Sequence, residues 1–290
     1  MVISRNAYGK INLGLDVIRK RPDGYHDLRM IMQTVDLYDT LTFEKQPQGI
    51  SLSIDNQELP VDENNLIYKA AKLMTDTYGI DGGVKITLNK RIPIAAGMAG
   101  GSTDAAATLK GMRDLYGLMV SDEELCRIGV KIGADVPYCV MGGTYLAEGI
   151  GEVLTKLPMP PKAVLLLAKP DINVSTAFVY GNLKLTEKTY HPDIDTQIDA
   201  LHKGDLQDLV ANMGNVLESV TAPAHPVIGK IEQIMRECGA MGAMMSGSGP
   251  TVFGIFTEEE TAKKAYDVLI AQGMTQVYIS SFINFESTEV

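Results

Sequence analysis

The stretch from Pro93 to Ala107 constrains the fold of this chain more than any other. It contains the small residues Gly97, Gly100 and Gly101 and runs directly into a series of alanines. Small residues let a backbone curve around a ligand and point its N–H groups inward. A helix that starts at such a bend adds unpaired amides and about half a positive charge at its N-terminus. The sequence therefore predicts a bend that leads into a helix over residues 103–116, with phosphate as its natural ligand.

An alternative for this stretch is a plain turn before a capped helix. The bend lacks the Gly-Lys-Ser/Thr ending of a P-loop and does not match GxGxxG. Ser102 and Thr103 could cap the helix, or offer hydroxyl groups to a phosphate oxygen or to Mg²⁺. A second small-residue cluster, Ser246 to Gly249, precedes a strand and favours a tight turn. Its serines lack the GxSxG spacing of a serine hydrolase, which argues against that class of enzyme.

The rest of the chain mixes helix and strand patterns. Ile11, Leu13, Leu15 and Val17 alternate with smaller or polar residues, which predicts a half-buried strand. The prolines from 158 to 161 suggest a boundary between domains 1–157 and 158–290. The fold class predicted is α+β. Further strands are expected at 40–44, 51–54, 84–88, 163–168, 241–245, 251–256 and 277–285, and helices at 64–78, after Ser121, and at 206–217, 226–237 and 259–272.

Charge and composition narrow the classes of partner. The formal net charge of -10 argues against nucleic acid, which needs a basic face. No apolar run approaches the length of a membrane span, and the N-terminus lacks the apolar block of a signal peptide. Three scattered cysteines are expected to be buried apolar residues in a reducing compartment. We therefore expect a cytoplasmic protein with no nucleic-acid or membrane partner.

Three segments together resemble the motifs of the GHMP kinase superfamily. They are the strand that carries Lys10, the loop and helix from Pro93 to Ala106, and the Ser246–Gly249 turn. Residues 21–26 (RPDGYH) and 133–137 (GADVP) are similar to one branch, which phosphorylates the 2-hydroxyl of a cytidine-diphosphate derivative of methylerythritol in the non-mevalonate route to isoprenoids. The likeness covers essentially the whole chain and is loosest between Lys184 and Pro226.

The resemblance implies a fold, a cofactor and a set of site residues. The fold would have an N-terminal lobe like ribosomal protein S5 domain 2, a ferredoxin-like C-terminal lobe, and the active site in the cleft between them. ATP and Mg²⁺ would be the cofactors, and the protein would be a monomer or a homodimer. The implied residues are Lys10 and Asp135 for catalysis; Asn65, Lys90, Pro93, Ile94, Ala95, Ala96, Gly97, Met98, Ala99, Gly100, Gly101, Ser102 and Thr103 for the nucleotide; and Asn12, Tyr25, His26 and Tyr180 for the substrate.

The chemistry of these residues suits phosphoryl transfer. Asp135 could accept the hydroxyl proton, and Lys10 could stabilise the carboxylate and the moving phosphoryl group. The alternatives are a turn aspartate and a solvated lysine. Tyr25 and Tyr180 could stack on a base, and His26 could read its polar edges, although all three could instead be packing residues. The basic residues 19–21 could attract a diphosphate or simply form a solvated hairpin tip.

Three other functions compete with this hypothesis. A related kinase could act on homoserine, mevalonate or a sugar, but those acceptors have no base for Tyr25 and Tyr180 to stack on. A non-enzymatic nucleotide-binding regulator should have lost Lys10 or Asp135, and both are present. A nucleic-acid-binding module would need a basic face that the composition lacks.

Overall fold

The computed structural model describes residues 2–283. They form two compact units, each built from separate stretches of the chain. The first unit contains residues 2–9, 37–92 and 99–141, and the second contains residues 10–36, 93–98 and 142–283. The long strands β1 (Val2–Lys20) and β2 (His26–Gln46) contribute to both. The boundaries of these units do not coincide with a single boundary after residue 157. The division into domains 1–157 and 158–290 stays a prediction.

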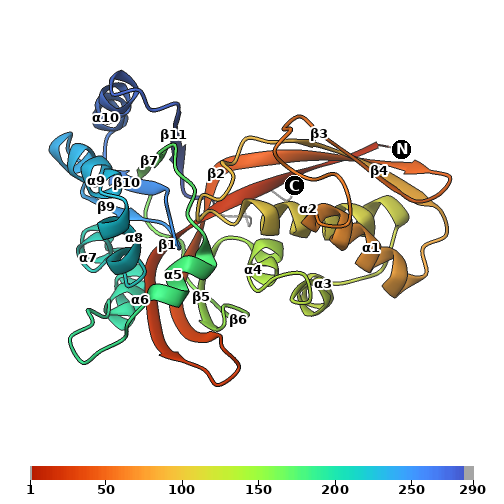
Figure 1. Cartoon of the computed structure of the whole chain (residues 1–290), viewed down its shortest axis with the longest axis horizontal. Coiled ribbons are helices and arrows are strands. Elements are labelled where there is room, and N and C mark those ends of the chain that lie inside the picture. Colours follow the sequence, from red (N-terminus) through yellow and green to blue (C-terminus); the bar gives the residue numbers. More distant parts are fainter. Residues whose placement is uncertain (1, 284–290) are drawn as a thin grey trace. The chain divides into compact units, whose positions relative to one another are not determined.

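The first unit packs helices on one side of its strands (Figure 1). Strand β4 lies between β3, to which it is parallel, and β2, to which it is antiparallel. Helix α1 turns Ile67, Ala70, Ala71 and Met74 inward, the i, i+3, i+4, i+7 spacing of an amphipathic helix. The elements are β3 (Ile50–Ile54), α1 (Leu66–Tyr78), β4 (Gly83–Asn89), α2 (Gly100–Tyr116), α3 (Asp122–Gly129) and α4 (Val136–Met141).

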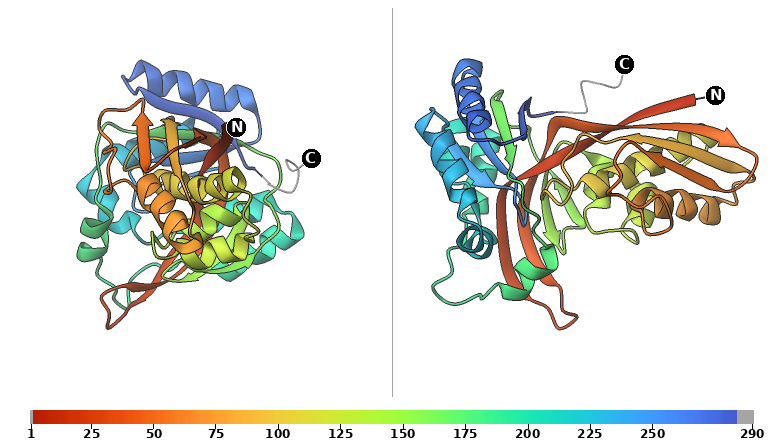
Figure 2. Two further views of the ribbon diagram at one scale, coloured as in Figure 1. Left: turned by 90° about the vertical axis from the view of Figure 1, so that its right-hand side faces the viewer. Right: turned by 45° about the horizontal axis from the view of Figure 1, so that its top comes forward.

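The second unit contains a four-stranded antiparallel sheet with the order β11-β7-β10-β9. Helices α9 and α10 pack on this sheet, as Figures 1 and 2 show. The chain passes through β7, α9, β9, β10, α10 and β11, which is the βαββαβ pattern of a ferredoxin-like fold. This lobe therefore has the predicted architecture. The elements are β7 (Val164–Lys169), α9 (Val227–Glu237), β9 (Gly242–Met245), β10 (Val252–Phe256), α10 (Glu259–Ala271) and β11 (Gln276–Ser281).

Some of the remaining elements of the second unit pair with its parts of β1 and β2, which are residues 10–20 and 26–36. Strand β5 pairs with β2 and with β6, and β8 pairs with β1. Between β7 and α9 the chain forms four more helices. These elements are β5 (Thr144–Gly149), β6 (Val153–Lys156), α5 (Thr176–Asn182), α6 (Ile194–Lys203), α7 (Leu206–Ala211), β8 (Gly214–Asn215) and α8 (Glu218–Ala224).

Three sequence-based expectations need correction. The helix predicted over 206–217 ends at Ala211, because Gly214 and Asn215 pair with Gly14 and Leu15 of β1 instead. Helix α2 begins at Gly100, one turn before the predicted start. The three cysteines form no disulfide bond with one another, and they are half-buried rather than fully buried. Of the strand predicted over 277–285, residues 284 and 285 lie outside the described residues.

No helix among the described residues is long and apolar enough to span a membrane.

Candidate functional site

Lys10 is a buried residue of β1. Its side chain is only 5% exposed, and its Nζ donates a hydrogen bond of 2.7 Å to Oδ1 of Asn12. Asn12 is fully buried and donates through Nδ2 to the sulfur of Met30. The alternative of a solvated lysine is wrong, because the side chain is buried. Burying an ammonium group is costly unless the group has partners. Asn12 holds the ammonium group, a contact that the sequence pattern does not predict.

The bend over residues 93–99 has an unusual backbone. Ala95, Gly97 and Ala99 have φ angles of 50°, 71° and 57°, in the left-handed region. Alanine adopts this region at a cost of about 1–2 kcal/mol, so the surrounding contacts must hold the bend in place.

Within the second unit, residues 97 and 98 of this bend make close contacts. Ser246 Oγ donates to the carbonyl of Gly97 at 3.0 Å, and the amide of Lys10 donates to the carbonyl of Met98 at 3.1 Å. A Cβ atom added to Gly247 would lie 3.5 Å from Lys10 Nζ. The Ser246–Gly249 turn, Lys10 and residues 97–98 are therefore brought together.

The first turn of α2 presents unpaired amides. Ala99 is the residue before the helix and has no side chain that could cap it. Thr103 Oγ1 donates to the carbonyl of Tyr8 at 2.7 Å, which holds this turn against β1. Ser102 Oγ makes no hydrogen bond with any residue from 2 to 283. Neither Ser102 nor Thr103 caps α2, although the sequence allows it. The uncapped backbone amides of the first turn suit an anion.

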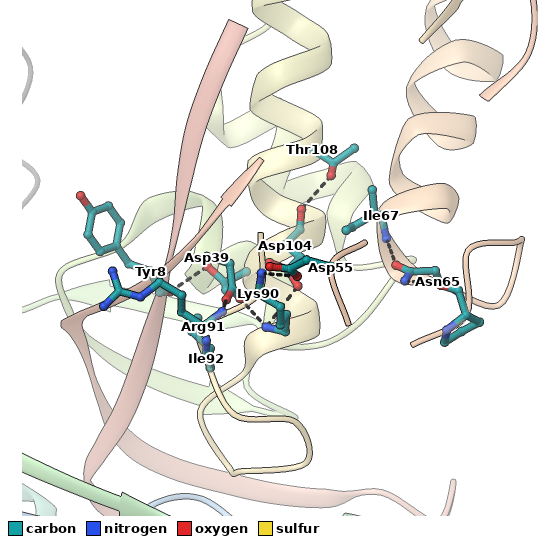
Figure 3. A network of polar contacts seen from close by, with 12 residues as sticks. Tyr8, Asp39, Asp55, Asn65, Ile67, Lys90, Arg91, Ile92, Asp104 and Thr108 are labelled. Atoms are coloured by element: carbon teal, nitrogen blue, oxygen red, sulfur yellow. Dashed lines mark hydrogen bonds and ion pairs between the residues drawn. The ribbon is translucent and has the colours of Figure 1, made fainter. Parts of the chain in front are cut away.

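Asn65 and Lys90 both have structural partners in the first unit. Asn65 caps α1 through Oδ1, which accepts from the amide of Ile67 at 2.9 Å, and its Nδ2 donates to the carbonyl of Pro60 at 2.7 Å. The side chain of Lys90 is buried and forms ion pairs with Asp39 and Asp104. Figure 3 shows this network. Their expected contacts with a nucleotide stay predictions.

Asp135 stands directly before α4. Its side chain is half-buried, and its backbone carbonyl accepts from the amide of Cys139 at 3.0 Å, so it does occupy a turn before a helix. Asp135 belongs to the first unit and Lys10 to the second. Their pairing at a transfer site remains a prediction.

Two of the predicted substrate residues meet in the second unit. The rings of His26 and Tyr180 lie 5.1 Å apart, tilted by 33°. Burial and, to a lesser extent, nearby Lys20 lower the pKa of His26, so its ring is neutral at pH 7. Tyr25 is 60% exposed, so most of its side chain is open to solvent. It follows a turn that is held by a hydrogen bond from its amide to Asp23.

The basic residues beside this turn are largely neutralised. Arg19 pairs with Asp27 at 2.5 Å, and Arg21 pairs with Asp23 and Asp27. The segment is therefore less positive than its sequence suggests.

Asn215 is a residue that the sequence reasoning missed. It is buried, and its Nδ2 donates to the carbonyls of Met245 at 2.9 Å and Gly247 at 2.8 Å. Its Oδ1 accepts from the amide of Leu217. Asn215 thereby fixes the turn that contacts Lys10 and Gly97. It stood within an expected helix, and nothing in the local sequence marks it.

Comparison with known proteins agrees with this arrangement. Family models for the N-terminal and C-terminal domains of GHMP kinases match residues 65–143 and 197–274. The chain thus belongs to the GHMP kinases, a family of ATP-dependent kinases that act on small molecules.

Closer relatives define the branch. The chain is 51% identical to a 4-diphosphocytidyl-2-C-methyl-D-erythritol kinase from Lachnoclostridium phytofermentans, over 100% of this chain and 99% of the relative. It therefore belongs to the 4-diphosphocytidyl-2-C-methyl-D-erythritol kinase family.

Solved structures of GHMP kinases have the same fold as this chain. A crystal structure of a 4-(cytidine 5'-diphospho)-2C-methyl-D-erythritol kinase matches with a TM-score of 0.83 and 31% identity, covering 97% of this chain and 100% of the other. A homoserine kinase from Cytophaga hutchinsonii matches with a TM-score of 0.81 and 21% identity, covering 97% and 95%. At that identity the second match supports the fold alone.

Proposed function

We propose that this protein transfers the γ-phosphoryl group of ATP to the 2-hydroxyl of 4-diphosphocytidyl-2-C-methyl-D-erythritol, in the non-mevalonate route to isoprenoids. The observation that carries the proposal is the combination of a full-length family match with the bend at residues 93–99. The bend leads into the uncapped first turn of α2, which offers backbone N–H groups to a phosphate chain. We expect the reaction to take place in the cytoplasm, in a monomer or a homodimer, with no nucleic-acid partner.

In this proposal the chemistry is shared between two side chains. Asp135 accepts the proton of the 2-hydroxyl while the hydroxyl oxygen bonds to the γ-phosphorus. The bond from that phosphorus to the β–γ bridging oxygen breaks, and ADP leaves. Lys10, held by Asn12, supplies a fixed positive charge for the transferring group. A fixed charge is effective because it needs no reorganisation during the reaction.

Mg²⁺ fits the proposal as an ion that arrives with ATP. No cluster of three or more His, Cys, Asp or Glu side chains within residues 2–283 could hold a metal by itself. Mg²⁺ in kinases keeps several waters and phosphate ligands, so one protein oxygen suffices, and the unbonded hydroxyl of Ser102 is suited to it. When bound, the ion would neutralise charge on the β- and γ-phosphates.

For the cytidine end we propose Tyr25, His26 and Tyr180. The exposed ring of Tyr25 offers a face for stacking, and a base stacked on an aromatic ring gains about 1–3 kcal/mol. A neutral His26 can both donate and accept a hydrogen bond at the polar edge of cytosine.

The test is a coupled assay of ADP release from ATP with the cytidine-diphospho substrate, homoserine or mevalonate as acceptor. The proposal requires turnover with the first compound and not with the others. Asp135→Asn should lower kcat by a factor of about 10²–10⁴, while affinity for an ATP analogue persists. Near-normal turnover of that variant would exclude the base role.

A second variant tests the cytidine contact. Tyr25→Ala should raise KM for the acceptor much more than KM for ATP. If both constants rose equally, the ring would have a structural role instead.

A further inference from the structure

A cluster of three buried charged side chains lies at the base of the bend. Asp39 comes from β2, Lys90 follows β4, and Asp104 is on α2. Their side chains are 0%, 5% and 4% exposed. Lys90 Nζ bonds to Asp39 Oδ2 and lies 3.5 Å from Asp104 Oδ2 (Figure 3). Three elements of the first unit are therefore tied together by one ammonium group.

Asp39 also holds the chain where it enters the bend. Its Oδ1 accepts from the amides of Arg91 at 2.5 Å and Ile92 at 2.8 Å. Those residues immediately precede Pro93. One carboxylate therefore binds the side chain of Lys90 and the backbone of the next two residues.

The other end of the bend contacts the same cluster. A Cβ atom added to Gly100, the first residue of α2, would lie 3.0 Å from Lys90 Nζ and 3.2 Å from Cγ2 of Ile92. Asp104, one turn further along α2, faces the same ammonium group. Residues 92 and 100 are thus held side by side, which closes the base of the loop between them.

We propose that Asp39, Lys90 and Asp104 form a clamp that holds the first turn of α2 in the position that binds the phosphates of ATP. Asp39 and Asp104 are positioning residues, since they act through Lys90 and the backbone of residues 91, 92 and 100. The clamp rests on the proposed function in one respect, which is that ATP is the ligand of the loop. It gives the side chain of Lys90 a task separate from the nucleotide contact expected from the sequence.

The two carboxyl groups of the clamp are not equivalent. Burial raises the pKa of Asp104 well above its usual range, the charge of Lys90 opposes the shift, and the charge of Asp39 adds to it. Asp104 Oδ1 also lacks a hydrogen-bond partner among residues 2–283. Asp39 is therefore the stronger partner of Lys90, because its Oδ2 bonds directly to Lys90 Nζ while Asp104 Oδ2 lies 3.5 Å away.

This asymmetry predicts different effects of the two amide substitutions. In Asp39→Asn, the amide oxygen can still accept from residues 91 and 92, but the amide nitrogen then faces the ammonium group of Lys90. In Asp104→Asn, the side chain keeps its size and loses only the longer contact of 3.5 Å with Lys90 Nζ. Asp39→Asn should therefore open the clamp, and Asp104→Asn should loosen it less.

The experiment measures the Kd of a non-hydrolysable ATP analogue by calorimetry, together with KM for ATP and for the acceptor. We expect Asp39→Asn to weaken analogue binding by about tenfold or more, with KM for the acceptor within about twofold of the wild-type value. Asp104→Asn should weaken analogue binding less than Asp39→Asn does, because Asp39 also holds the amides of residues 91 and 92. Asp55→Asn is the matched control, because exposed Asp55 also accepts from a backbone amide of Lys90, at 2.9 Å, but is not tied to α2.

Two results with the Asp39→Asn variant would overturn the clamp. One is a folded Asp39→Asn protein that binds the analogue as the wild type does. The other is an equal rise in both KM values, which would indicate a general structural role. Should Asp39→Asn fail to fold, Lys90→Met carries the test through hydrogen exchange without nucleotide. Amides of residues 91–102 should then exchange faster than in wild type while those of α10 do not, and unchanged exchange at 91–102 would refute the clamp.

Failure of the clamp and failure of the proposed function can be told apart. A wild-type protein that binds the analogue but does not phosphorylate the cytidine-diphospho acceptor would refute the function and leave the clamp testable. An active wild type whose Asp39→Asn variant shows no change would refute the clamp alone.

Discussion

Replacing Gly97 with alanine should disrupt the bend at its contact with the Ser246–Gly249 turn. A Cβ atom at this position would lie 2.2 Å from the carbonyl oxygen of Ser246 and 3.1 Å from both the nitrogen and the oxygen of Gly249. All three are backbone atoms, which cannot swing away as the end of a flexible side chain can. The bend or the turn would have to move by about 1 Å to restore normal contact distances.

The energetic cost has two parts. Alanine at a φ of 71° costs about 1–2 kcal/mol, and overpacking against backbone costs about 1–3 kcal/mol more. The free energy of unfolding should therefore fall by about 2–5 kcal/mol. If the bend shifts to relieve the clash, the affinity for ATP should fall instead. In either case KM for ATP should rise, because the amides of the bend leave their positions.

The assay is urea unfolding at 25 °C together with KM for ATP. Gly229→Ala is the control, since Gly229 lies inside α9 with open space around its Cβ position and an ordinary φ. Alanine there should stabilise the protein by about 0.5–1 kcal/mol. If Gly97→Ala matched wild type in both stability and KM, the close approach of the two backbones would be refuted.

Three further predictions concern other positions. Gly111→Ala should destabilise the first unit by about 1–3 kcal/mol, because its Cβ would lie 2.5 Å from the ring of Phe43; a midpoint of urea unfolding equal to that of wild type would contradict this. Asn215→Ala should raise KM for ATP and lower the melting temperature, because the carbonyls of Met245 and Gly247 lose their donor; unchanged values would show that the turn holds itself. Burial, followed by the charge of Glu232, raises the pKa of Glu218 to about 8. The unfolded chain releases this proton above pH 4.5 and the folded chain keeps it, so wild-type stability should fall as pH rises from 4.5 to 8, by several kcal/mol at most. Glu218→Gln should gain stability relative to wild type over the same range, and a difference that is equal at pH 5 and pH 8 would exclude this explanation.

Much of the fold could be predicted because the decisive signals are local. Small residues before an alanine-rich helix predict the bend and α2 wherever the rest of the chain lies. Short apolar stretches and turn residues likewise predict β7, β9 and β10 and thereby the α+β class. The motif residues around Lys10, residues 93–103 and Asp135 were sufficient to indicate the family, which the comparisons confirm.

Other features depend on pairings between residues that are far apart in the sequence. Asp39 lies 51 residues from Lys90, and neither residue alone differs from a surface charge in a strand pattern. The partners of Asn215 are 30 and 32 residues away, and β8 exists only because β1 offers it a free edge. The sequence by itself thus determined the family, the bend and the ferredoxin-like lobe. Only the tertiary structure decided that Lys10 is buried against Asn12 and that two acids enclose Lys90, because burial and charge pairing arise when distant segments pack.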